Sequence, residues 1–408
     1  MSKFVKNAII GQSGGPTAAI NATAAGVIYG IYENRDLIPK VYGMRNGIEG
    51  FLNENLIDLS GLSDGELQKL IRTPASAFGS CRRKLPDVTK EPETYAKIFE
   101  IFEKCDIGYF FYIGGNDSMD TVAKLSAYAK EKKFDVRIIG VPKTIDNDLV
   151  ETDHTPGFGS AAKYIAVTVG EIIRDCAVYT IPAVTIVEIM GRDSGWLTAS
   201  SAVGRIVNGL SPDLVYLPEI DFDTEKFLAD VKAALDRHPN VVIAVSEGLR
   251  SADGHYVGEG TQSGVSDVFG HKYLAGTGNA LTAVVKERFG CKVRAIELNL
   301  CQRCAAHLQS KTDIDESVAV GKAAVAAATS GVYGEMMTIN RKPGEKYAVE
   351  YSHVDASKVA NFIKTVDRKF INEAGNNVTD ECCRYLLPLI QGEVKTEFIG
   401  GLPEYFVI

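Results

Sequence analysis

The 408-residue sequence lacks the features of membrane and nucleic-acid-binding proteins. No apolar stretch approaches the ~20 residues that a bilayer requires, and the run from Ile181 to Met190 is interrupted by Glu188. Only Lys3 and Lys6 precede a few apolar residues at the N-terminus, too little for a signal peptide. The net charge of −8 leaves no broad positive surface for nucleic acid. We therefore expect a cytoplasmic protein that binds neither membranes nor nucleic acid.

The chain also lacks a cysteine framework and the common nucleotide fingerprints. Its eight cysteines are scattered, and the spaced pair Cys301 and Cys304 has no second pair to complete a zinc site. The six histidines show no metal-ligand spacing. Gly11-Gln-Ser-Gly-Gly-Pro16 lacks the third glycine of the dinucleotide motif, and no Walker loop occurs. Reduced thiols are expected, and dehydrogenase and P-loop functions are disfavoured.

One segment carries two carboxylates and a cation at the end of a predicted strand: Gly140-Val-Pro-Lys-Thr-Ile-Asp-Asn-Asp148. Asp146 is suited to accept the proton of an attacking hydroxyl, and Asp148 to hold a metal or orient that base. Lys143 is suited to neutralise a phosphoryl donor. Asp-Asn-Asp also suits an ordinary turn, so this segment alone leaves phosphoryl transfer and a simple turn as alternatives.

Two glycine-rich turns follow apolar strands. Phe110-Phe-Tyr-Ile-Gly-Gly115 leads into a helix predicted over 118–132, and Asn7-Ala-Ile-Ile-Gly11 leads into a helix ending near Tyr32, with Pro16 in its first turn. Glycines at such junctions let backbone N–H groups approach a phosphate, and the helix N-terminus attracts the anion. Two such turns in one chain favour phosphate binding.

Strands alternate with helices, as in parallel α/β layers. The predicted strands cover 8–11, 41–43, 109–113 and 137–141 in one layer, and 184–189, 214–216 and 241–246 in a second, after a helix over 160–176. Ligands bind at the carboxyl ends of such strands, where the motif residues lie. In the tail we expect a helix from about Thr312, whose small residues over 318–327 pack closely on a neighbour, and an amphipathic helix over 358–373.

Seven segments then occur in one order: Gly11-Gln-Ser-Gly-Gly-Pro-Thr17, Gly79-Ser-Cys-Arg82, Gly114-Gly-Asn-Asp-Ser118, Pro142-Lys-Thr-Ile-Asp-Asn-Asp148, Met190-Gly-Arg192, Ser246-Glu-Gly248 and Gln302-Arg303. This series resembles the phosphofructokinase family. The resemblance implies an α/β fold of two parallel-sheet, three-layer domains with the active site in the cleft between them. It also implies that Asp146 is the base that activates the 1-hydroxyl of fructose 6-phosphate.

The resemblance assigns the other catalytic and acceptor residues. Thr144 touches the sugar phosphate, Asp148 assists electrostatically or through Mg²⁺, and Arg82 spans donor and acceptor phosphates. The implied substrate-binding residues are Thr144, Asp146, Met190, Gly191, Arg192, Glu247 and Arg303, with Glu247 accepting bonds from sugar hydroxyls and Arg303 gripping the 6-phosphate. A second basic contact to that phosphate is unassigned, with His307 and Lys311 as candidates. Arg83, next to Arg82, is expected at the surface.

The implied donor residues separate two branches of the family: Gly15, Gly115, Asn116, Asp117, Ser118 and Lys143. ATP-using members usually carry glycines where Asp117 and Lys143 stand. A carboxylate at 117 adds bulk and negative charge where the α-phosphate of ATP would lie, and Lys143 offers a compact charge to pyrophosphate. Asn116 replaces a family Asp that helps to bind Mg²⁺, so Asn116, Asp117 and Asp148 are the candidate metal ligands.

The sequence thus predicts a Mg²⁺-dependent, reversible transfer from pyrophosphate to fructose 6-phosphate in glycolysis or gluconeogenesis, by a homodimer or homotetramer. We expect a donor domain over 1–146, completed by about 265–305, an acceptor domain over 147–264, and a helical region over 306–408 that completes or covers the acceptor domain. The alternatives are an ATP-dependent 6-phosphofructokinase and a non-catalytic regulatory subunit or metabolite sensor. The intact Asp146, Asp148 and Arg192 favour catalysis.

Overall fold

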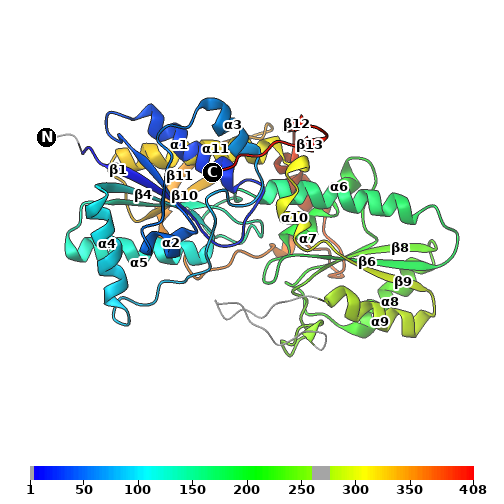
Figure 1. Cartoon of the computed structure of the whole chain (residues 1–408). Coiled ribbons are helices and arrows are strands. Elements are labelled where there is room, and N and C mark those ends of the chain that lie inside the picture. The colour runs from blue at the N-terminus through cyan, green and yellow to red at the C-terminus, as the bar shows by residue number, and fades with distance from the viewer. Residues whose placement is uncertain (1–3, 260–275) are drawn as a thin grey trace.

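The computed structural model describes residues 4–259 and 276–408, which form a larger and a smaller lobe side by side (Figure 1). The larger lobe is built on a seven-stranded sheet in the order β11-β10-β5-β4-β1-β2-β3. Its strands are β1 (Asn7–Gln12), β2 (Val41–Met44), β3 (Leu56–Asp58), β4 (Ile107–Gly114), β5 (Arg137–Pro142), β10 (Glu335–Arg341) and β11 (Val349–Asp355). The edge strands β3 and β11 run antiparallel to their neighbours, and the rest are parallel.

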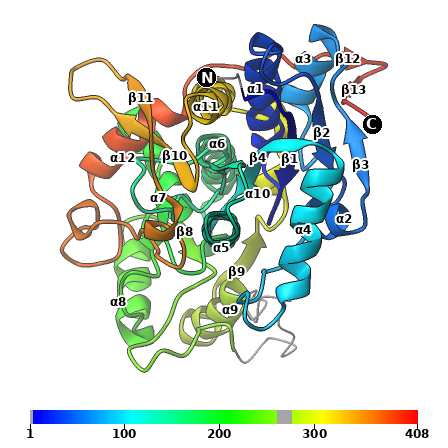
Figure 2. The same cartoon turned by 90° about the vertical axis from the view of Figure 1, so that its left-hand side faces the viewer.

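Helices cover both faces of this sheet (Figure 2). On one face lie α1 (Ile20–Glu33), α3 (Asp64–Arg72) and α11 (Lys311–Thr329), and on the other α2 (Gly47–Leu52), α4 (Pro92–Lys104) and α5 (Asn116–Lys132). The alternation of side chains along β1 explains the layers. Ala8 and Ile10 join the core beneath α1, whereas Ile9 joins the core beneath α4.

The smaller lobe is a four-stranded, wholly parallel sheet in the order β7-β8-β6-β9. Its strands are β6 (Ala183–Ile189), β7 (Leu214–Tyr216), β8 (Asn240–Ser246) and β9 (Lys292–Glu297). The helices α6 (Phe158–Cys176), α7 (Trp196–Ser200) and α12 (Asp380–Leu386) pack on one face, and α8 (Thr224–Leu235) and α9 (Thr277–Phe289) on the other. The predicted α/β architecture of two three-layer units is confirmed.

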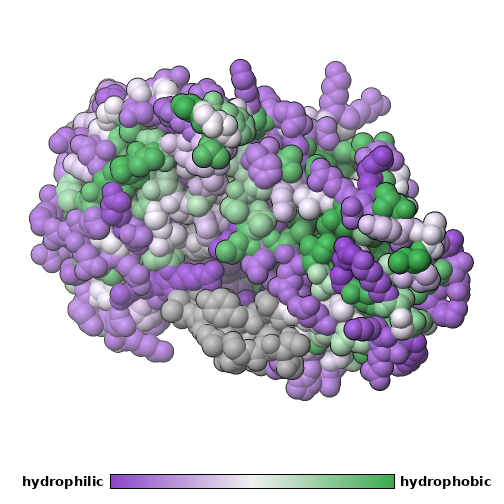
Figure 3. All heavy atoms as spheres, turned by 45° about the vertical axis from the view of Figure 1, so that its right-hand side comes forward, coloured by the Kyte–Doolittle hydropathy of each residue, from purple (hydrophilic) through white to green (hydrophobic). Residues whose placement is uncertain are grey.

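Short elements complete the chain. They are α10 (Cys301–Cys304), the 3-10 turns η1 (Val203–Ile206), η3 (Ala306–Leu308), η4 (Ala356–Lys358), η5 (Arg368–Phe370) and η6 (Leu387–Ile390), and the hairpin of β12 (Phe398–Ile399) and β13 (Leu402–Pro403). Hydrophilic residues cover much of the face drawn in Figure 3. Within the described ranges, no helix has both the length and the apolar character needed to cross a membrane.

The C-terminal region differs from the expected division of the chain. β10, β11 and α11 belong to the larger lobe, while α12 and η6 pack on the smaller one. β9, expected to complete the donor domain, pairs with β6 in the smaller sheet; residues 265–275 lie outside the described residues. The predicted close packing of the 318–327 segment is confirmed, because a Cβ at Gly26 of α1 would lie 2.2 Å from the carbonyl of Val318 in α11.

Two predicted helices are wrong in extent or existence. The first helix begins at Ile20, and Pro16 precedes it, because Thr17 Oγ1 accepts the N–H groups of Ala19 and Ile20 and ends the glycine-rich turn there. Residues 358–373 form no amphipathic helix. Their apolar residues serve different cores: Val359 packs beside β10, whereas Phe370 packs in the smaller lobe. Residues 361–367, between the two cores, therefore form neither helix nor strand.

Candidate active site

A cavity of about 470 Å³ lies where strands of both sheets end. Its lining includes residues that follow β1, β4 and β5 of the larger lobe and β6 and β8 of the smaller one. Of the residues predicted for the site, the following line it: Gly15, Arg82, Gly115, Asn116, Asp117, Ser118, Lys143, Thr144, Asp146, Asp148, Met190, Arg192, Glu247 and Arg303. The motifs, scattered over the sequence, thus meet in one place.

Lys143 joins the two glycine-rich turns. Its backbone N–H donates to the carbonyl of Gly114 at the end of β4, and its Nζ donates to the carbonyls of Ser13 and Gly15, both at 2.7 Å. The side chain is only 2% exposed. An ammonium has three donors, so two hold the first glycine-rich turn and one remains for a ligand. The N-terminus of α5 opens into the same cavity at Asn116, which adds backbone N–H groups suited to a phosphate.

Burial in the cavity disfavours the charged form of Lys143. Burial lowers the pKa of Lys143 to about 7, and the neighbouring cations Arg303 and Arg82 act in the same direction. Asp146 and Asp148 oppose that shift. Because a bound polyanion would replace the lost hydration of the ammonium, the site is electrostatically prepared for a phosphate or pyrophosphate.

Asp117 is paired, which the sequence did not indicate. Its Oδ1 lies 3.1 Å from Nζ of Lys84, a residue that also lines the cavity. The predicted bulk and negative charge at 117 are thus accompanied by a lysine side chain that lines the same cavity.

The loop after β5 brings its two carboxylates together. The N–H of Asp146 donates to Thr144 Oγ1 at 3.1 Å, and Thr144 is itself held by Thr155 and Pro156. Burial, followed by the nearby Asp148, raises the pKa of Asp146, and burial also raises that of Asp148. A raised pKa makes Asp146 a stronger base than an ordinary aspartate once it is ionised.

The acceptor side is shaped by the turn after β6. Gly191 has φ 128°, which a residue with a Cβ adopts only with strain. This conformation lets its N–H donate to Glu247 Oε1 at 3.2 Å and its carbonyl accept from Ser246 Oγ at 2.6 Å. Gly191 itself is not among the lining residues, so its role is to hold Glu247. Burial, and then Asp146, raise the pKa of Glu247 to about 8.

Arg303 stands at the boundary of the two halves. It lies on α10, after β9, and a Cβ at Gly15 would be 3.4 Å from its Nη1. Burial lowers the pKa of Arg303, and the nearby Arg82 adds to that shift. The two guanidinium groups and Lys143 therefore concentrate positive charge beside the glycine-rich turn. Neither His307 nor Lys311, the candidates for a second basic contact, lines the cavity.

The described residues contain no cluster of three or more His, Cys, Asp or Glu side chains able to hold a metal by themselves. Asp148 is the best placed of the predicted ligands, because its buried Oδ1 has no hydrogen-bond partner. Asp117 is engaged by Lys84. The amide of Asn116 is engaged at both ends by the backbone of Asn361 and Phe362. A Mg²⁺ ion usually takes one or two carboxylates and completes its shell with substrate phosphates and water, and this donor set fits that pattern.

Several residues that line the cavity were not predicted from the sequence. Arg83, expected at the surface, lines the cavity together with Lys84. Asp193 and Ser194 follow the Met-Gly-Arg motif directly, and this adjacency is a signal that could have found them. Asn361 and Ile363 come from the C-terminal region, where no sequence motif pointed to the site. Their position follows only from the fold.

The sequence matches the family described as Phosphofructokinase over residues 7–328. The pyrophosphate–fructose 6-phosphate 1-phosphotransferase of Halomonas elongata is 44% identical over 402 residues, which cover 98% of this chain and 95% of that protein. The protein of the same name from Methylococcus capsulatus is 41% identical over 406 residues, covering 99% and 96%. The crystal structure of the pyrophosphate-dependent phosphofructokinase from Nitrosospira multiformis has a TM-score of 0.89 at 40% identity, covering 98% of this chain and 96% of that one. With a family match across most of its length and relatives aligned almost end to end, the chain belongs to the phosphofructokinase family.

Proposed function

We propose that the protein transfers a phosphoryl group from pyrophosphate to the 1-hydroxyl of fructose 6-phosphate, giving fructose 1,6-bisphosphate and phosphate, reversibly. The observation that carries the proposal is Lys143, whose ammonium holds the first glycine-rich turn and whose backbone N–H holds the second, in the cavity that Asp146 also lines. The relatives from Halomonas elongata and Methylococcus capsulatus bear the name of this activity. Their similarity extends over 98% and 99% of this chain.

In the forward direction, the carboxylate of Asp146 accepts the proton of the 1-hydroxyl as that oxygen bonds to the terminal phosphorus. The anhydride P–O bond breaks, and phosphate leaves with the bridging oxygen. Lys143 and Arg82 offset the negative charge on the donor and the leaving phosphate, which is how phosphoryl-transfer sites usually lower the barrier. Thr144 holds the Asp146 loop through its hydroxyl.

The smaller lobe would bind the sugar phosphate. Met190, Gly191 and Arg192 form the turn after β6, and Glu247 follows β8, so the fold presents them together. Glu247 would accept hydrogen bonds from sugar hydroxyls, and Arg192 would contact the sugar or the developing charge. Arg303 would bind the 6-phosphate, or the phosphate beside Gly15, given its approach to that turn.

Magnesium fits the remaining donor set. Asp148 would hold the ion, with Asp117 as a second candidate and with phosphate oxygens and water completing its shell. When bound, Mg²⁺ neutralises charge on the pyrophosphate oxygens. Asn116 Oδ1 already accepts the N–H of Asn361, so one lone pair of this oxygen would be left for the ion. We further propose that the protein acts in the cytoplasm as a homodimer or homotetramer.

The experiment follows both directions of the reaction by ³¹P NMR on the purified chain. Pyrophosphate with fructose 6-phosphate should give fructose 1,6-bisphosphate, and fructose 1,6-bisphosphate with phosphate should give pyrophosphate. Asp146→Asn is the control, since it keeps the shape but removes the base and should reduce both rates by about 10²–10⁴-fold. A folded wild-type chain without turnover on any donor would instead support the regulatory-subunit alternative.

A further inference from the structure

The residues 361–364, here called the C-terminal strap, pass along the cavity although they carry no recognised motif. Asn361 and Ile363 are among its lining residues. The strap lies between η4 and η5, in a segment that runs from the larger lobe to the smaller one. It is therefore an additional wall of the site, supplied by a part of the chain far from the seven motifs.

Asn116 fixes one end of the strap. Its Oδ1 accepts the N–H of Asn361, and its Nδ2 donates to the carbonyl of Phe362. Asn361 also has φ 67°, a left-handed conformation that asparagine tolerates better than most residues. Both functional ends of the Asn116 amide are used in this way. An aspartate at 116 would accept from Asn361 but would have no proton to donate to Phe362.

Lys364 fixes the other end to the loop that carries the two carboxylates. Its backbone N–H donates to the carbonyl of Asp148 at 2.8 Å. Its Nζ donates to Asn147 Oδ1 at 3.3 Å, to the carbonyl of Thr152 at 3.1 Å and to that of Asp153 at 2.8 Å. One lysine thus ties four residues of the loop to the strap. The exposed residue Lys358, on the same segment, makes no such contacts with the residues that the structure describes.

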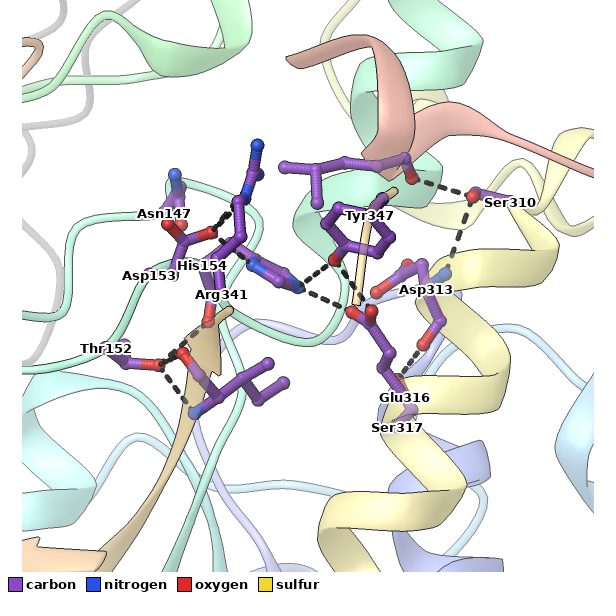
Figure 4. Close-up of polar contacts among 12 residues, drawn as sticks. Asn147, Thr152, Asp153, His154, Ser310, Asp313, Glu316, Ser317, Arg341 and Tyr347 are labelled. Carbon is purple, nitrogen blue, oxygen red and sulfur yellow. Dashed lines mark hydrogen bonds and ion pairs between the residues drawn. The ribbon is translucent and has the colours of Figure 1, made fainter. Parts of the chain in front are cut away.

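The loop is supported from α11 as well. Figure 4 shows Asp153 and His154 on one side and Glu316 of α11 on the other, with Tyr347 between them. His154 Nε2 lies 2.5 Å from Glu316 Oε2, and His154 Nδ1 lies 2.8 Å from Asp153 Oδ2. The part of the loop after Asn147 is therefore held by α11 and by Lys364, and also by Ile339 and Arg341 of β10 and by Tyr385 of α12.

We propose that the C-terminal strap is a functional part of the donor site, that Lys364 is a positioning residue for the loop bearing Asp146 and Asp148, and that Asn116 anchors the strap instead of binding the metal. The proposal rests on the proposed phosphoryl transfer. Removing the Lys364 ammonium would take its donor from the carbonyl of Thr152 and leave the carbonyl of Asp153 to the hydroxyl of Tyr385. The loop would lose these side-chain ties to the strap, although the backbone N–H of residue 364 would still donate to the carbonyl of Asp148. Substrates would still bind, but the base and its neighbour would be less well aligned, and such misplacement lowers kcat.

The first test compares Lys364→Met with the control Lys358→Met. After wild-type turnover with pyrophosphate is established, so that failure of the function itself is recognised, Lys364→Met should lower kcat by about tenfold to a hundredfold. The KM for fructose 6-phosphate should change less than about threefold, because the acceptor contacts remain. Amide exchange in peptides covering 143–153 should accelerate while the thermal midpoint stays near that of Lys358→Met. Unchanged kcat and exchange in Lys364→Met would overturn the proposal.

The second test separates an anchor from a metal ligand at position 116. If Asn116 anchors the strap, Asn116→Asp and Asn116→Ala should both lower kcat and raise amide exchange in peptides covering 360–365. Neither variant should lower the Mg²⁺ concentration that turnover requires. If Asn116 were a ligand, the added carboxylate of Asn116→Asp would sustain turnover at lower Mg²⁺ concentration than wild type requires, with exchange in the strap unchanged, and this part of the proposal would be overturned.

Discussion

The ammonium of Lys84 lies 3.1 Å from the carboxylate of Asp117, and both side chains line the cavity. Asp117 stands in the first turn of α5, two residues after Gly115. We attribute the proposed exclusion of ATP to this carboxylate, which the lysine holds in place. Substituting each residue separately therefore distinguishes the contribution of the carboxylate to donor selectivity from that of the lysine.

Asp117→Gly should admit ATP. The change removes both the bulk and the negative charge, so we expect kcat/KM with ATP to rise by at least about tenfold, which corresponds to ~1.4 kcal/mol, while kcat/KM with pyrophosphate falls. Initial rates with each donor measure this. Lys84→Met is the matched variant, because it keeps Asp117 and should keep ATP excluded. If Lys84→Met admits ATP as well as Asp117→Gly does, the carboxylate is not the excluding element.

Lys143 should make pyrophosphate binding depend on pH. In the ligand-free site burial lowers the pKa of Lys143 to about 7, so the amine is charged below that pH and increasingly neutral above it. Lys143→Met should weaken pyrophosphate binding at pH 6.5 by about tenfold to a hundredfold, the usual worth of a hydrogen bond to a charged group. Calorimetric titration at pH 6.5 and pH 9 measures the dissociation constant of pyrophosphate for the wild type and for Lys143→Met.

The ligand's own titration is common to wild type and Lys143→Met, so the ratio of their dissociation constants isolates the lysine. That ratio should shrink as the pH rises from 6.5 to 9. A ratio that stays constant over this range would mean that Lys143 remains fully charged before the ligand binds, against the proposed effect of its burial.

His154 should stabilise the fold most at low pH. Burial opposes its charge, but hydrogen bonds to Asp153 and Glu316 outweigh that effect and raise the pKa of His154 above its usual value of 6.5. A raised pKa means that the stabilisation is fully present below about pH 6.5 and is lost as the pH rises through the folded-state pKa. The charges around it include Arg341, which pairs with Asp153, and Tyr347 donates to Glu316.

Accordingly, His154→Gln should lower the free energy of unfolding by about 3 kcal/mol near pH 6, as expected for a broken buried ion pair, and by less at pH 9. Urea denaturation at both pH values measures the difference from wild type. A penalty that is equal at the two pH values, or larger at pH 9, would show that His154 is not charged in the folded protein.

The sequence predicted most of the site because its residues lie where strands end. Asp146 and Asp148 follow β5 directly, and Met190 follows β6, so apolar runs that stop at chemical motifs located them before the fold was known. Lys84 could not be paired with Asp117 in this way, because it lies in an extended segment without periodicity. The pairing depends on where that segment crosses the turn.

The C-terminal region was predicted least well for a related reason. The spacing of apolar residues over 358–373 resembles a helix, but Val359 and Phe370 are buried in separate cores, and residues 361–367 between them form neither helix nor strand. The local spacing of apolar residues does not distinguish the apolar face of one helix from residues that are buried in two separate cores. For the same reason the contacts of Asn361 and Lys364 with the site became visible only in the folded chain.

The proposed site binds inorganic pyrophosphate as the phosphoryl donor and excludes nucleotides. The most direct measurement is the ratio of kcat/KM for pyrophosphate to kcat/KM for ATP on the wild-type protein, with fructose 6-phosphate and Mg²⁺ saturating. We predict a ratio above about a hundred, equivalent to ~2.7 kcal/mol of discrimination. A ratio near one, or a preference for ATP, would contradict the claim.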